Sequence, residues 1–102
     1  LVITENGSSY DDVKVDGEVL DTKRTAYLVA HLQSLQKAVT EGAPVKGYFA
    51  WSLLDNFEWA EGYLKRFGLV YIDYQNQKRT LKQSALAFSD FLAKFFGILG
   101  IF

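Results

Sequence analysis

The sequence predicts an α/β fold in which parallel strands alternate with crossover helices. Two short runs rich in β-branched and aromatic residues, at residues 1–4 and 45–51, are each followed by a long loop and then by an amphipathic helical pattern. The order is therefore strand, loop, helix, strand, loop, helix. Alternation of this kind is typical of a parallel sheet covered by helices.

The first predicted strand, residues 1–4 (LVIT), is short and shows no alternation of apolar and polar positions. Such a run suits a fully buried parallel strand. The dipeptide Asn6-Gly7 ends it, because this pair is a strong turn signal. Residues 8–20 are mostly polar and contain Asp-Asp and Asp-Gly, so we expect a long surface loop there.

The first predicted helix begins at Asp21 or Thr22, either of which can cap its N-terminus. Gly42 stands where a C′ residue belongs and Pro44 follows two residues later, so we expect the helix to end there. About 20 residues at 1.5 Å each give a length of roughly 30 Å. The single histidine, His31, falls within this helix, and we interpret it as a packed or solvated residue. The apolar stripe consists of Leu28, Leu32, Leu35 and Val39, widened by Tyr27 and Ala38. The residues off the stripe are Lys23, Arg24, Gln33, Gln36 and Lys37.

The second half of the chain repeats this order. After the strand at residues 45–51 comes a long aromatic loop, then a further short extended piece at residues 67–73 and a polar turn at residues 75–78. The second helix begins near Gln83. It places on one face, at spacings of three and four, Ala85, Phe88, Leu92 and Phe95.

Composition bounds the function classes. The chain has 102 residues, 49% of them apolar, with a net charge of −1, which suits a globular domain and gives no electrostatic reason to expect nucleic acid or a membrane surface as partner. The absence of cysteine excludes disulfides and thiolate metal sites, and we expect a cytoplasmic location. No signal peptide is visible, and the start reads straight into a strand, so we expect an internal cut rather than a natural N-terminus.

The uncharged tail at residues 97–102 is too short to span a bilayer, which needs about 20 residues. We expect it to pack against a neighbouring layer or a partner chain; a membrane-seeking tail is the alternative.

The aromatic loop at residues 53–59 interleaves acidic and amide side chains with large rings. Buried charge is costly unless it is paired, so this mixture is not a simple core segment. Rings that cover the apolar face of a pyranose, beside polar groups that bind its hydroxyls, make a sugar-binding surface. Structural interpretations stay open at this point: Trp51 and Trp59 could be packing anchors, Glu58 a solvated residue, and Glu5 a polar residue entering a turn. We interpret Asp55-Asn56 as structural residues that hold the loop by side-chain-to-backbone bonds.

Three segments then carry a resemblance: ITENG at residues 3–7, GYFAWSLLDNFEW at residues 47–59 and KRFG at residues 65–68. In this order and spacing they closely resemble glycoside hydrolase family 1, the retaining β-glucosidases and β-galactosidases built on a (β/α)₈ barrel. The resemblance runs from residue 1 to about residue 94. It implies that residues 1–102 are the C-terminal portion of a single TIM barrel domain, a fragment with the last two βα units, strands 7 and 8 and their helices.

The resemblance also implies roles for five residues. Glu5 would be the nucleophile at the end of strand 7, and Trp51, at the end of strand 8, would wall the glycone site. Glu58 would accept hydrogen bonds from the 4- and 6-hydroxyls of the sugar, Trp59 would reach the 3-hydroxyl through its ring N–H, and Phe67 would close the apolar side. Neither a cofactor nor a metal is implied.

Departures from the family pattern limit the isolated chain. The acid/base glutamate of the family lies in a T-x-N-E-P motif, which does not occur here, and Leu81 stands where the family usually has proline. A retaining glycosidase needs both carboxylates, so we expect no double-displacement turnover from this chain alone. The expected partners are a β-glucoside or related small saccharide and the remainder of the barrel or further copies of the chain. The alternative function is a structural module whose two open sheet edges favour complementation or self-association.

Overall fold

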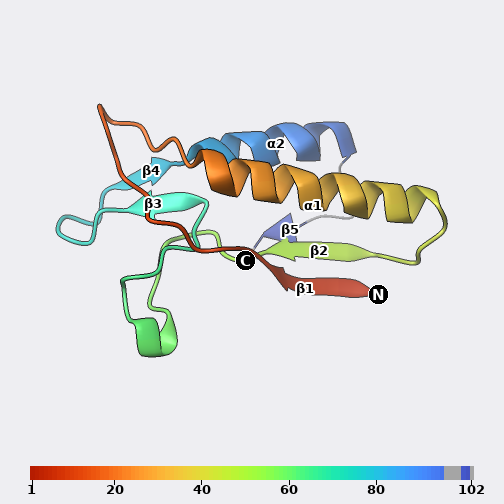
Figure 1. The fold of residues 1–102 in the computed structure, drawn as a ribbon, viewed down its shortest axis with the longest axis horizontal. Coiled ribbons are helices and arrows are strands. Elements are labelled where there is room, and N and C mark those ends of the chain that lie inside the picture. The colour runs from red at the N-terminus through yellow and green to blue at the C-terminus, as the bar shows by residue number, and fades with distance from the viewer. Residues whose placement is uncertain (96–99, 102) are drawn as a thin grey trace.

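The computed structural model describes residues 1–95 and 100–101 and contains two helices packed side by side against one face of a small parallel sheet (Figure 1). In chain order the elements are β1 (Val2–Asn6), α1 (Thr22–Thr40), β2 (Gly47–Ala50), the single 3₁₀ turn η1 (Trp59–Glu61), β3 (Val70–Ile72), β4 (Arg79–Leu81), α2 (Gln83–Phe95) and β5 (Gly100–Ile101). The predicted α/β class and its strand–helix order are confirmed. The expectation of a fully buried first strand is wrong, since β1 has no buried residue and the helices cover only one face of the sheet.

The parallel sheet has the order β1-β2-β5, and a separate antiparallel hairpin is formed by β3 and β4. The hairpin lies beyond the ends of β1 and β2, on the side where both helices begin (Figure 1). It fulfils the expectation of an extended piece near residues 67–73, whereas β4 is an element that the sequence analysis did not predict.

The core lies between the sheet and the helices. Phe88 of α2 contacts the ring of Tyr48 in β2, with ring centroids 6.3 Å apart. Ile3 and Leu92 pack against this cluster from β1 and α2. The predicted stripe of α1 supplies the other large members, and the buried residues of the cluster are Leu28, Leu32, Leu35, Tyr48, Ala50, Leu69 and Phe88.

Two expectations about the helices need correction. Asp21 occupies the N-cap position of α1 as predicted, but its side chain makes no capping bond to that helix. Arg24, placed off the apolar stripe, is buried, because ion pairs with aspartates enclose its guanidinium. His31 is exposed and its Nδ1 lies 2.8 Å from the carbonyl oxygen of Tyr27, in agreement with its interpretation as a packed or solvated helix residue.

The loop at residues 8–20 and the sheet edges also differ from expectation. The loop is only partly a surface loop, since Val19 is buried and the Asp12 side chain is enclosed. The sheet was expected to be open at both edges, but β5 pairs with the outer edge of β2 through Gly100 and Ile101. The expectation that the tail at residues 97–102 packs against a neighbouring layer or a partner chain falls mostly on residues 97–99 and 102. These lie outside the described residues. Neither described helix is long and apolar enough to cross a membrane.

Removal of residues 96–102 should increase self-association. The truncation uncovers the edge of β2, and an open strand edge is a template for pairing with another chain. Sedimentation velocity over a concentration series measures the effect, with Ile101→Val as a control that keeps a β-branched residue at the paired position. Identical sedimentation of the truncated and full chains would contradict a protective role for β5.

Candidate active site at the carboxyl ends of the strands

The carboxyl ends of β1 and β2 lie directly against each other. The backbone N–H of Trp51 donates to the carbonyl of Asn6 at 2.9 Å. A Cβ atom at Gly7 would lie 1.9 Å from the carbonyl oxygen of Trp51, so only glycine allows this approach. The Asn6-Gly7 pair therefore ends β1 and also brings the strand end against Trp51.

A register irregularity near the end of β1 decides which way Glu5 faces. Ile3 pairs with Tyr48 and Asn6 with Ala50, so two residues of β1 lie opposite the single residue Phe49. Ile3 and Asn6 both face the helices, since Ile3 packs on the core and Asn6 bonds to residues on that side. The two bulged residues, Thr4 and Glu5, are exposed and lie on the opposite face.

Phe67 lies beside the end of β2. Its carbonyl accepts from the N–H of Ser52 at 3.2 Å, and the Ser52 carbonyl accepts from the N–H of Leu69 at 2.9 Å. Gly68 allows this contact, because a Cβ there would lie 2.2 Å from the backbone nitrogen of Asp55. Of the predicted site residues, the fold thus brings Glu5, Trp51 and Phe67 to the same end of the sheet.

Glu58 and Trp59 lie farther out. Trp59 begins η1 and Glu58 directly precedes it, in the green loop that leaves the sheet and returns to β3 in Figure 1. A bond from the Glu58 N–H to the Gly62 carbonyl, 2.7 Å long, closes this turn. Trp59 is 82% exposed and its φ is +41°, in the left-handed region. The described part of the chain does not enclose the Trp59 indole.

Behind this edge, the Asn6 side chain connects β1 to β2 and to α1. Its Oδ1 accepts from the Tyr48 hydroxyl at 2.6 Å, and its Nδ2 donates to the Tyr27 hydroxyl at 3.2 Å. Burial raises the pKa of Tyr48 above its ordinary value, and the nearby Tyr27 raises it further. The Tyr48 hydroxyl is thus kept as a neutral donor.

Below the loops, six charged side chains alternate in sign along one chain of ion pairs, which we call the charge chain. Lys82 is fully buried, and its Nζ lies 2.6 Å from Asp12 Oδ2 and 2.8 Å from Asp55 Oδ1. Asp55 continues to Arg66, whose Nη1 lies 2.6 Å from Asp55 Oδ2. In order, the members are Asp21, Arg24, Asp12, Lys82, Asp55 and Arg66.

The other end of the charge chain reaches both helix starts. Arg24 pairs with Asp12 and Asp21 at 2.9 and 2.6 Å. Burial opposes its charged form, but the hydrogen bonds and charges of both aspartates outweigh this, so the pKa of Arg24 lies above its ordinary value. Asp21 Oδ1 accepts from the backbone N–H of Ser84 at 2.9 Å, and the Ser84 hydroxyl donates to Asp21 Oδ2. Asp21 thus satisfies a backbone donor in the first turn of α2 instead of capping α1.

The structural interpretation of Asp55-Asn56 is confirmed. Asp55 Oδ1 accepts from the N–H of Gly68 at 3.0 Å, and Asn56 Nδ2 donates to the carbonyl of Leu54 at 2.9 Å. The charge chain itself was missed by the sequence analysis. The only available signal was the presence of charged residues at the boundaries of helices and loops, and that pattern is also typical of solvated surface.

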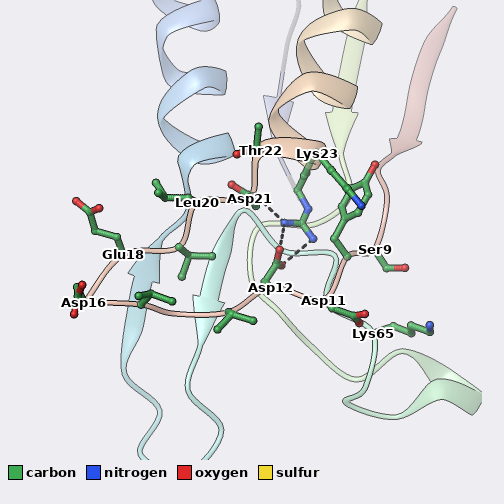
Figure 2. A pocket seen from close by; sticks show the side chains of 15 residues that line it. Ser9, Asp11, Asp12, Asp16, Glu18, Leu20, Asp21, Thr22, Lys23 and Lys65 are labelled. Atoms are coloured by element: carbon green, nitrogen blue, oxygen red, sulfur yellow. Dashed lines mark hydrogen bonds and ion pairs between the residues drawn. The ribbon is translucent and has the colours of Figure 1, made fainter.

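A groove of about 780 Å³ lies over the charge chain, between the loop at residues 9–20 and the start of α1 (Figure 2). The Asp12–Arg24 pair lies at its inner side, and Lys65 extends from the neighbouring loop. None of the predicted sugar-binding residues lines it. In residues 1–95 and 100–101, no group of three or more His, Cys, Asp or Glu side chains could hold a metal ion.

Comparison with known proteins identifies the family. The sequence profile of glycosyl hydrolase family 1 matches residues 1–95. The chain belongs to this family. Beta-glucosidase A of Thermotoga maritima is 60% identical over 91 residues, which cover 88% of this chain and 20% of that protein.

Solved structures of family 1 members agree. The family 1 β-glucosidase of Thermotoga maritima in complex with isofagomine lactam superposes with a TM-score of 0.84 at 55% identity, over 95% of this chain and 22% of that one. A psychrophilic β-glucosidase from Micrococcus antarcticus gives a TM-score of 0.88 at 50% identity, over 92% and 20%. The chain spans about a fifth of the length of these relatives. It is a fragment of the family 1 TIM-barrel fold.

Replacement of the buried cation should strongly destabilise this family 1 chain. In Lys82→Met, the enclosed carboxylates of Asp12 and Asp55 lose their shared partner, and such a loss typically costs about 3–5 kcal/mol. Urea unfolding measures the free energy, with Lys78→Met as a matched control, because Lys78 lies exposed in the turn after β3. A loss below about 1 kcal/mol, the range of exposed pairs, would contradict the proposed importance of Lys82.

Alkaline pH should destabilise the wild-type chain more steeply than Tyr48→Phe. The folded-state pKa of Tyr48 is raised, so above the ordinary tyrosine value of 10.0 the unfolded chain binds fewer protons than the folded one. Stability is then lost as pH rises, by at most about 1.4 kcal/mol per pH unit from this one group. Urea unfolding between pH 8 and pH 11.5 measures the slope, and equal slopes in both proteins would contradict this assignment.

Proposed function

We propose that this chain forms the last two strand–helix units of a retaining β-glycosidase barrel, with β1 as strand 7 and β2 as strand 8. The observation that carries the proposal is the position of Glu5. The bulge turns it to the face that the helices leave uncovered, at the carboxyl ends of the strands and beside Trp51. In TIM barrels the helices lie outside and the chemistry is located at the carboxyl ends of the strands, so this is where a catalytic carboxylate belongs.

In the proposed reaction Glu5 is the nucleophile. Its carboxylate attacks the anomeric carbon, the bond from that carbon to the glycosidic oxygen breaks, and the leaving oxygen takes a proton from a second carboxylic acid. A water molecule then attacks the same carbon, the ester bond to Glu5 breaks, and the second carboxylate takes the proton of the water. The second carboxylate must lie about 5–5.5 Å from Glu5 and come from the remainder of the barrel.

We propose that four residues form one wall of the glycone subsite. Trp51 covers the sugar ring and Phe67 closes the apolar side, which agrees with their position at the end of β2. Glu58 accepts hydrogen bonds from the 4- and 6-hydroxyls, and the Trp59 ring N–H donates to the 3-hydroxyl. The roles of Glu58 and Trp59 are supported by the left-handed backbone of Trp59. Such a conformation costs a non-glycine residue about 1–2 kcal/mol, and strained conformations of this kind are concentrated at ligand sites.

The proposed substrate is a terminal β-D-glucosyl residue, because the relatives named above are called β-glucosidases. No cofactor or metal takes part in this mechanism. For location we propose the cytoplasm, since a chain without cysteine needs no oxidising compartment.

The test is a chimeric barrel, in which residues 1–95 replace the matched segment of the Thermotoga maritima relative. The chimera should hydrolyse an aryl β-glucoside, and Glu5→Ala should lower kcat by at least about a thousandfold, as the loss of a nucleophile does. Glu41→Gln, at the exposed end of α1, is the matched control and should leave kcat unchanged. An active Glu5→Ala chimera would show that Glu5 is not the nucleophile.

The same assay addresses the second candidate function, a module that must be complemented by the rest of the barrel. The observation that favours it is the sheet face that bears Glu5, which nothing covers in the described part of the chain (Figure 1). The isolated chain should give no turnover. Turnover by the pure isolated chain would contradict the requirement for a second carboxylate from elsewhere.

A further inference from the structure

We propose that Asn6, Tyr48 and Tyr27 form a positioning device that fixes the direction of Glu5. This inference rests on the proposed role of Glu5 as nucleophile and adds three residues to which no role in the site has so far been given. None of the three is expected to touch the sugar, since all act from the helix-covered face of the sheet.

The device is needed because Glu5 lies in a bulge. At a bulge the regular ladder of backbone hydrogen bonds is interrupted, so the strand itself determines the local direction less firmly. The next residue, Asn6, is bonded at both ends of its side-chain amide, to the Tyr48 hydroxyl at 2.6 Å and the Tyr27 hydroxyl at 3.2 Å. These side-chain bonds replace the missing backbone constraint one residue away from Glu5.

The two tyrosines differ in how firmly they are held. Tyr48 is 1% exposed and contacts Phe88 in the core. Tyr27 is half-buried, and its ring lies tilted against the exposed ring of His31, with centroids 4.0 Å apart. The Asn6 amide is therefore bonded to a tyrosine of β2 that core packing fixes and to a second tyrosine on α1. A supporting shell of this kind keeps a site in its productive geometry.

The same residue couples Glu5 to the sugar-binding wall. The backbone carbonyl of Asn6 accepts from the N–H of Trp51 at 2.9 Å, while its side chain is bonded to the tyrosines. Movement of Asn6 would change the position of Glu5 relative to Trp51, and thus relative to a sugar lying on Trp51. Displacement of a reacting group by 1 Å can cost about a hundredfold in rate, so a smaller shift should be measurable.

The experiment uses the chimeric barrel, at a temperature well below its thermal unfolding. Tyr48→Phe keeps the ring but removes the donor to Asn6 and should lower kcat roughly tenfold, while KM for the aryl β-glucoside changes less than about twofold. Tyr71→Phe is the matched control, because the Tyr71 hydroxyl has no hydrogen bond to the described residues, and it should leave kcat unchanged.

A double-mutant cycle separates positioning from general stability. If Tyr48 acts through Asn6, Tyr48→Phe should cause no further loss of kcat in an Asn6→Ala background. Should Asn6→Ala fail to fold, Tyr27→Phe supplies the second test, since it breaks only the other bond of the amide and should lower kcat in the same direction.

Three results would overturn the inference: a lower unfolding temperature with unchanged kcat in Tyr48→Phe, additive losses in the cycle, or unchanged kcat in Tyr27→Phe. The experiment distinguishes a failure of this inference from a failure of the proposed function. A chimera that needs Glu5 but tolerates Tyr48→Phe refutes only the positioning device, whereas a chimera active without Glu5 refutes the nucleophile itself.

Discussion

The buried chain of alternating charges is the constraint on which the loop architecture depends. Three carboxylates and three cations are joined in one sequence of ion pairs, and Lys82, at its centre, is fully buried. Removal of any inner member leaves a charge in the interior without its partner, so the set is stable only when it is complete. Its members come from the loop at residues 8–20, the starts of both helices and the loop that follows β2. The charge chain therefore connects segments that are far apart in the sequence, since Lys82 and Asp12 are separated by 70 residues.

The two faces of the parallel sheet differ in what they carry. The helices, the apolar cluster and the Asn6 amide lie on one face, while Glu5 is turned to the other by the bulge in β1. The two faces meet at the ends of β1 and β2, where Gly7 packs against the Trp51 carbonyl and the Phe67 carbonyl is bonded to the N–H of Ser52. The position of the proposed site thus follows from the packing behind it.

The sequence was sufficient to predict the elements whose patterns are local. The apolar stripe of α1, the two strands and the end of the first strand at Asn6-Gly7 each depend on neighbouring residues, and the structure confirms their positions. The charge chain could not be predicted, since Lys82 and Asp12 are 70 residues apart and an isolated lysine is most often solvated. The bulge was equally hidden, because a register shift depends on the partner strand, and the two residues of β5 are too few for any periodicity.

The uncovered face links assembly of the barrel to its chemistry. Burial of apolar surface drives association, and this face carries the exposed Val2 and the half-buried Phe49 beside the proposed nucleophile. In the mechanism proposed above, the part of the barrel that covers these residues also leaves room for a sugar at Glu5 and supplies the second carboxylate. In the proposed mechanism, the uncovered side of the sheet therefore depends on the remainder of the barrel twice, for burial of its apolar residues and for the second carboxylate.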